Sequence, residues 1–119
     1  MKMGKVVREK SYGFALLMIK AYKYLSVSQR EFVLSKQMLR SGTAIGALIR
    51  EAEYAQPKAD FVHKLSIALK EANETAYWIS LLEDSEYMEK TGAISLMNDC
   101  YELIKLLTSI IVTSKQSAK

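Results

Sequence analysis

Side chains able to bind a metal or act as nucleophiles are rare in this sequence of 119 residues. His63 is the only histidine and Cys100 the only cysteine, which excludes an internal disulfide framework and a cysteine-rich zinc site. A carboxylate-bridged metal pair in a helical bundle needs inward glutamates on two helices and Glu-x-x-His on the other two. The sequence offers a single Asp60-x-x-His63 instead. We therefore expect no metal and no cofactor, with His63 at the surface or at an interface.

The other reactive groups do not suggest catalysis either. Cys100 falls on or beside an apolar helical stripe, where a thiol is typically buried and inert. Glu51, Glu71 and Glu74 are helix carboxylates whose spacing isolates no acid–base pair. The segment Arg40-Ser41-Gly42-Thr43 follows no strand and lacks the Gly-Lys-Ser/Thr ending of a phosphate-binding loop. We predict that the protein is not an enzyme.

These side chains must be positioned by helices. Between 61 and 82, core residues recur at alternating spacings of four and three, which predicts a long helix that starts at Pro57. Its inward residues are Phe61, Leu65, Ala68, Ala72, Thr75, Ile79 and Leu82. A capping box from Ser28 to Glu31, with Val27 and Phe32 as a hydrophobic staple, predicts a preceding helix from about 29 to 55.

Two more helices complete the expected fold. One runs from 8 or 11 to 25, and the other from about 93 to 113. Four helices with short connections predict an all-α protein, an up-down-up-down antiparallel four-helix bundle. We expect a single domain over 1–119, with flexible ends at about 1–7 and 114–119.

Composition favours a cytoplasmic protein. The basic N-terminal residues are followed by no small-residue cleavage site, so a signal peptide is not indicated. The longest apolar runs are far shorter than the roughly 20 residues that span a bilayer, and we expect no membrane partner. A single cysteine also fits a reducing compartment.

Charge is distributed unevenly along the chain. Residues 1–40 hold nine basic against two acidic residues, a balance of +7, whereas residues 41–119 have a balance of −3. Basic residues interleaved with tyrosines on the first helix are a weak form of a nucleic-acid-binding pattern. The candidate contacts there are Arg8, Lys10, Lys20 and Lys23. An ordinary solvated helix face is the alternative.

Some large apolar residues remain after the core positions are filled. Tyr54, Tyr77, Trp78 and Leu81 are the clearest, and tyrosine and tryptophan are enriched at subunit contacts. We therefore predict self-association, with these four residues at the oligomer interface. Two functions stay open: nucleic-acid binding, and a protein-interaction scaffold with no affinity for RNA or DNA.

From about residue 8 to 113 the chain resembles the bacterial four-helix-bundle family named for 23S rRNA intervening sequences. The segments that carry the resemblance are Arg8-Glu9-Lys10-Ser11-Tyr12, Leu39 to Ala47, Ile49-Arg50-Glu51-Ala52, Ala55 to Asp60, Lys64 to Thr75, Tyr77-Trp78 and Asn98 to Ile111. Where the family often has an asparagine, this chain has Leu48.

The resemblance implies a cytoplasmic bacterial bundle, often a barrel-like homopentamer. Some members are encoded within insertions in ribosomal RNA genes, and many have no known molecular role. The family is also similar to accessory proteins of diversity-generating retroelements, which are basic pentamers that bind a reverse transcriptase and nucleic acid. It provides no catalytic residues to transfer. Arg40 and Arg50 are carried over as shared basic positions, and Arg40 has the alternative of pairing with Glu51 or a neighbouring subunit.

Overall fold

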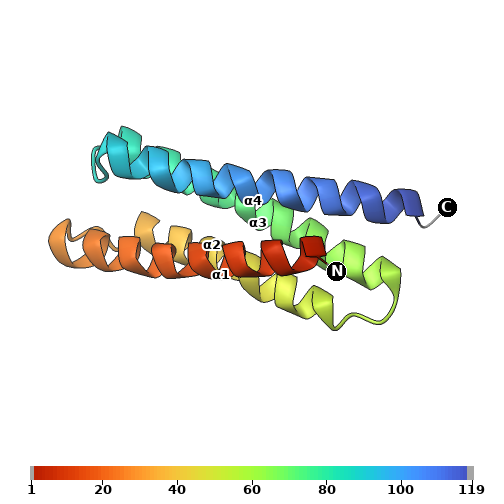
Figure 1. Ribbon diagram of the computed structural model, residues 1–119. Helices are drawn as coiled ribbons and strands as arrows, with labels where there is room; N and C mark the ends of the chain where they lie inside the picture. Colours follow the sequence, from red (N-terminus) through yellow and green to blue (C-terminus); the bar gives the residue numbers. More distant parts are fainter. Residues whose placement is uncertain (1, 118–119) are drawn as a thin grey trace.

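The computed structural model describes residues 2–117 and is built from four long helices in an elongated bundle of 49 × 20 × 20 Å (Figure 1). The elements are α1 (Lys2–Lys23), a short π-helical segment η1 (Tyr24–Ser28), α2 (Leu34–Glu53), α3 (Lys58–Asp84) and α4 (Lys90–Ser117). The described residues contain no strand. The predicted all-α antiparallel four-helix bundle is confirmed.

The helices form two layers, one of α1 and α2 and the other of α3 and α4 (Figure 1). Helices α2 and α3 pack most extensively, whereas α1 and α4 have the fewest contacts of the neighbouring pairs. The predicted stripe on α3 lies in the core, where Leu65 to Leu82 supply buried side chains at the expected positions and Phe61 is half-buried. Leu48 is half-buried and packs against this core. No described helix has both the length and the hydrophobicity that a bilayer crossing requires.

Gly42 allows α1 and α2 to approach closely. A Cβ at this position would lie 2.5 Å from both Cγ and Sδ of the fully buried Met18. We expect Gly42→Ala to destabilise the fold by about 1–2 kcal/mol, because overpacking a filled core outweighs the gain in helix propensity. If helix propensity alone decided the outcome, the same change would instead stabilise the fold by up to about 1 kcal/mol. Urea denaturation measures the change, and a stabilised Gly42→Ala variant would contradict this packing account.

The predicted capping box is wrong. Helix α2 begins at Leu34 rather than near 29, because η1 continues the first helix to Ser28 and Arg30 then takes a positive φ of 54°. Glu31 caps α2 alone: its Oε2 accepts from the N–H groups of Val33 and Leu34 at 3.0 Å, and its Oε1 accepts from Ser35 N–H at 2.7 Å. The expected staple is also absent, since Val27 and Phe32 are both exposed.

The expected flexible ends are helical over the described residues. Helix α1 already begins at Lys2, and Val7 is buried in the core. Helix α4 extends to Ser117. Residue 1 and residues 118–119 of those two expected segments lie outside the described part of the chain.

Candidate nucleic-acid interface

Three of the six candidate cations are ion-paired within the subunit. The Arg8 Nη1 atom lies 3.3 Å from Glu53 Oε2, and this ion pair joins α1 to α2. The Lys10 Nζ atom lies 3.1 Å from Glu102 Oε1, and this ion pair joins α1 to α4. These pairs are exposed, so they are weak in energy, but each carboxylate still reduces the positive charge presented to a phosphate.

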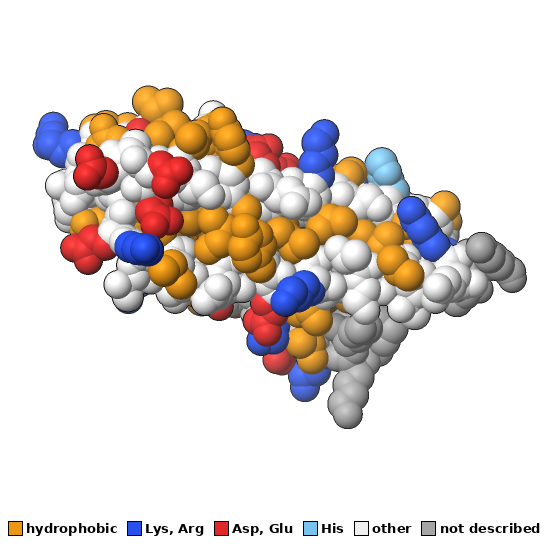
Figure 2. Space-filling view, turned by 90° about the horizontal axis from the view of Figure 1, so that it is seen from above, with side chains coloured by type: hydrophobic (Ala, Val, Ile, Leu, Met, Phe, Trp, Pro, Cys, Tyr) orange, Lys and Arg blue, Asp and Glu red, His pale blue; other side chains and the backbone are white. Residues whose placement is uncertain are grey.

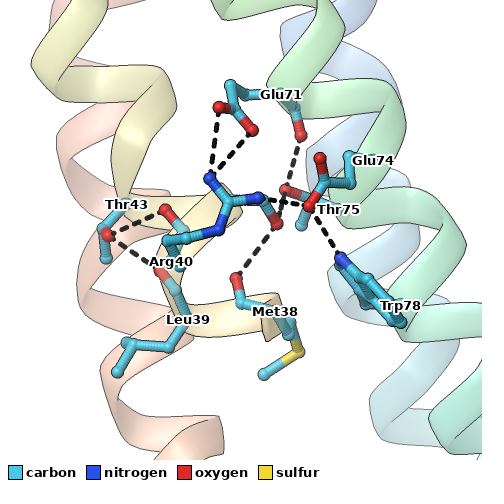
Figure 3. Close-up of polar contacts among 9 residues, drawn as sticks. Met38, Leu39, Arg40, Thr43, Glu71, Glu74, Thr75 and Trp78 are labelled. Carbon is cyan, nitrogen blue, oxygen red and sulfur yellow. Dashed lines mark hydrogen bonds and ion pairs between the residues drawn. The ribbon is translucent and has the colours of Figure 1, made fainter. Parts of the chain in front are cut away.

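Arg40 is held most firmly. Its guanidinium donates to both Glu71 oxygens at 3.3–3.4 Å and also to Glu74, so one side chain of α2 bridges two carboxylates of α3 (Figure 3). These hydrogen bonds, first to Glu71 and then to Glu74, raise the pKa of Arg40. The Trp78 indole N–H donates to Glu74 at 3.0 Å, and this bond, with Arg40, lowers the pKa of Glu74 despite partial burial. Arg40 therefore links two helices rather than facing solvent alone.

Substitution of Arg40 distinguishes its role in linking α2 to α3 from a role in binding nucleic acid. We expect Arg40→Gln to lower the free energy of unfolding by about 1 kcal/mol or less, since the network is largely exposed. Its affinity for nucleic acid should stay within about twofold of the wild type, because the charge is already compensated. Denaturation and a fluorescence anisotropy titration measure the two quantities. A large loss of nucleic-acid affinity in a stably folded variant would show that Arg40 does contact nucleic acid.

Lys20, Lys23 and Arg50 make no ion pair within the described part of the chain. All three are exposed. Arg50 lines a hollow of about 260 Å³ between α1 and α2, together with Arg8, Tyr12 and Thr43. The phenol of Tyr12 is 61% exposed beside it. This combination of cation, hydroxyl and aromatic ring suits a phosphate and an adjacent base.

The six candidates do not form one patch. Arg8 and Lys20 are twelve residues apart on α1, about 18 Å along the helix axis. Antiparallel packing brings Gly46 beside Ser11 and Gly42 beside Met18. Arg50 is therefore level with the Arg8 end of α1, and the Lys20–Lys23 end is level with the start of α2. Lys10 points to the other side of α1, into a hollow beside α4.

Lys36 was missed by the sequence analysis. It is exposed near the start of α2, level with Lys23, and makes no ion pair within the described chain. Lys36, Thr43 and Arg50 are spaced by seven residues, opposite the buried Met38, Ile45 and Ala52. This seven-residue spacing is the sequence pattern from which the exposed position of Lys36 could have been predicted. We define the basic face as Lys20, Lys23, Lys36 and Arg50.

Reactive groups gather nowhere in the described chain. Cys100 is fully buried, its thiol lies 3.2 Å from the Ala72 carbonyl, and burial raises its pKa to about 12, so little thiolate exists at neutral pH. His63 is exposed, as expected. No group of three or more metal-ligating side chains occurs among the described residues.

The four residues expected at an oligomer interface are spread over the bundle. Tyr54 at the end of α2 is 76% exposed and Tyr77 on α3 is 58% exposed. Trp78 and Leu81 are half-buried, and the Trp78 ring meets that of Tyr77 edge-on at 5.2 Å. Because α3 starts next to the end of α2, Tyr54 and Tyr77 lie on the order of 30 Å apart. They do not form one contact surface.

The same bundle occurs in known proteins. A family model described as "23S rRNA-intervening sequence protein" matches residues 5–109. The chain belongs to this family. A crystal structure of another protein, described as one of unknown function from the S23 ribosomal protein family of Bacteroides thetaiotaomicron VPI-5482, is 56% identical to this family member. The match has a TM-score of 0.91 and covers 92% of this chain and 97% of that one. A comparison with curated proteins finds no match.

The resemblance inferred from the sequence is thereby confirmed. The matched region of the 23S rRNA-intervening sequence protein family includes α2 and α3 entirely, most of α1 and α4, and all four residues of the basic face. It ends within α4, before Ser117.

Proposed function

We propose that this member of the 23S rRNA-intervening sequence protein family is a non-enzymatic homo-oligomer that binds nucleic acid through its basic face. The observation that carries the proposal is that Lys20, Lys23, Lys36 and Arg50 are exposed on one layer without compensating ion pairs in the described chain. Phosphate groups are the ligands that such separated, uncompensated cations attract in a salt-dependent way. A bacterial cytoplasmic location belongs to the same proposal, in keeping with one buried, reduced cysteine.

Non-catalytic binding is supported by how the carboxylates are used. Glu71 and Glu74 bind Arg40, Glu51 binds Lys64 at 3.0 Å, and Glu31 caps a helix. Each therefore has a structural partner. A phosphate bound at the basic face would meet lysine and arginine donors for its oxygens.

Titration with labelled RNA and DNA oligonucleotides tests the nucleic-acid part. We expect the association constant to fall steeply as salt rises, because bound phosphates release counterions, by a logarithmic slope of about −0.7 per contact on a single strand. Undetectable binding at low salt would reject the proposed nucleic-acid binding and favour the alternative function, a protein-interaction scaffold.

Self-association is supported by a second surface. The face formed by α3 and α4 bears a band of hydrophobic side chains along its length (Figure 2). On α4, Ile94, Tyr101 and Val112 are each 47–49% exposed. On α3, Val62, Leu69 and Ala76 are half-buried at spacings of seven. A continuous apolar band of this kind typically marks a protein contact.

Light scattering tests the oligomer. We expect a mass above that of the 13.5 kDa chain at tens of micromolar. The family resemblance favours a pentamer, and Tyr54, Tyr77, Trp78 and Leu81 remain proposed contributors to its interfaces. A monomer under these conditions would reject self-association. A reverse transcriptase or other protein could then occupy the exposed apolar faces, and the family resemblance makes such a partner part of the proposal.

A further inference from the structure

A groove follows the side of the bundle where α1 and α4 pack least closely. It contains two hollows, of about 220 and 490 Å³. From α1 it is lined by Lys10, Gly13, Leu17, Lys20 and Tyr24, and from α4 by Gly92, Leu96, Asp99 and Leu103. Both sets recur at spacings of three and four, the pattern that accepts the ridge of another helix.

Two glycines border this groove without serving their own subunit. A Cβ at Gly13 or at Gly92 would meet nothing within 4 Å. Each glycine nevertheless disfavours the helix that contains it. Gly42 differs, because its missing Cβ makes room for Met18. The open space at Gly13 and Gly92 leaves room for the close approach of a helix from outside the subunit.

A matching ridge lies elsewhere on α4. Ile94, Asn98, Tyr101, Lys105, Thr108 and Val112 follow one another at spacings of four and three on the exposed side of the helix. Lys105 is a cation of this ridge without an ion pair in the described chain. Asp99 in the groove likewise has no ion pair there, because Lys10 is taken by Glu102. The ridge therefore offers a cation, and the groove a carboxylate, each unpaired within the described chain, for one charge-complementary contact between copies.

We infer that α4 of one copy docks its ridge into the α1–α4 groove of the next copy, with Lys105 facing the neighbour's Asp99. The inference rests on the proposed self-association and specifies its geometry. The contact is heterologous, since it joins two different surfaces, and repeated contacts of this kind form a closed ring or a filament. It covers both unpartnered apolar surfaces at once, whereas pairing of the α4 ridge with itself would leave the groove empty. On the basic face, Lys23, Lys36 and Arg50 stay open, whereas Lys20 borders the groove and becomes partly covered.

Two variants test the inference by light scattering. Gly13→Leu with Gly92→Leu fills the groove, and Ile94→Glu with Tyr101→Glu disrupts the ridge. Both pairs of positions face open space or solvent, so thermal denaturation should show intact folding. We expect each variant alone to be monomeric. An equimolar mixture should give a heterodimer and nothing larger, because it combines one intact ridge with one intact groove.

The outcomes are distinguishable. A wild-type monomer would reject the proposed self-association itself. A wild-type oligomer with either folded variant still assembled, or a mixture that stays monomeric, would overturn only the heterologous geometry.

Charge exchange provides an independent check. Asp99→Lys and Lys105→Asp should each lower the association constant by tenfold or more, and the double variant should recover most of the loss. Positions 99 and 105 are six residues apart on one helix and do not face each other, so recovery reports contact between subunits. If the folded double variant shows no recovery, Asp99 and Lys105 do not contact each other between subunits, and the proposed docking register is wrong.

Discussion

Replacing both Lys20 and Lys23 by glutamate should lower the affinity for single-stranded RNA at low salt by at least tenfold. The double variant removes two phosphate contacts, and the logarithmic salt slope should become shallower by about 1.4. The new carboxylates also repel the strand. Both lysines are exposed on α1 and make no ion pair within the described chain, so the fold should be retained. Fluorescence anisotropy at several salt concentrations gives affinity and slope together.

Lys70→Glu is the matched control. Lys70 is an exposed cation on α3, in the other layer of the bundle. Its reversal changes the net charge but leaves the basic face intact. An equal loss of affinity per reversed charge at Lys70 and at the α1 lysines would indicate a response to net charge alone. Unchanged binding in the double variant would remove Lys20 and Lys23 from the interface.

Glu31→Ala should lower the free energy of unfolding by about 2 kcal/mol, because three N–H groups at the start of α2 lose a charged acceptor. Burial alone raises the pKa of Glu31, but the backbone hydrogen bonds from Leu34, Ser35 and Val33 outweigh it, so the pKa is lowered from about 4.5. Because the pKa of Glu31 is lower in the folded state, its ionised carboxylate stabilises the fold at pH values above the ordinary pKa of about 4.5. That stabilisation is lost as pH falls through the folded-state value.

Urea denaturation between pH 7 and pH 3 tests this assignment. The difference between wild type and Glu31→Ala should be largest at neutral pH and should shrink as the medium becomes more acidic than about pH 4.5. Glu9→Gln, at an exposed carboxylate of α1 without an ion pair in the described chain, should change stability by less than about 0.5 kcal/mol. A pH-independent difference for Glu31→Ala would contradict the role of the ionised carboxylate.

The helices could be predicted because their apolar residues repeat with the helical period. The stripe from Phe61 to Leu82 placed α3 almost to the residue. The start of α2 could not be predicted in this way, since two capping arrangements compete in the same segment. Ser28 with Glu31 satisfies the local capping pattern, but continuation of α1 through η1 buries Leu25 and leaves Glu31 to cap a later start.

The candidate interface was less predictable because charge in the sequence does not reveal its partners. Arg40 and Lys20 both carry a positive charge, yet antiparallel packing brings Glu71 and Glu74 to Arg40, whereas Lys20 makes no ion pair in the described chain. Such pairings join residues about 30 positions apart, which helical periodicity does not register. Lys36 could have been found from its spacing to Arg50, whereas the open space at Gly13 and Gly92 emerges only from the packed bundle.

The salt dependence of RNA binding by wild type and by a variant with Lys20, Lys23, Lys36 and Arg50 all changed to glutamine tests the proposed function most directly. We predict a steep logarithmic slope for the wild type and a slope shallower by about 3 for the variant, one phosphate contact being lost at each position. Identical slopes for the two proteins, or a wild type that binds no RNA at low salt, would contradict the assignment of the basic face as a nucleic-acid interface.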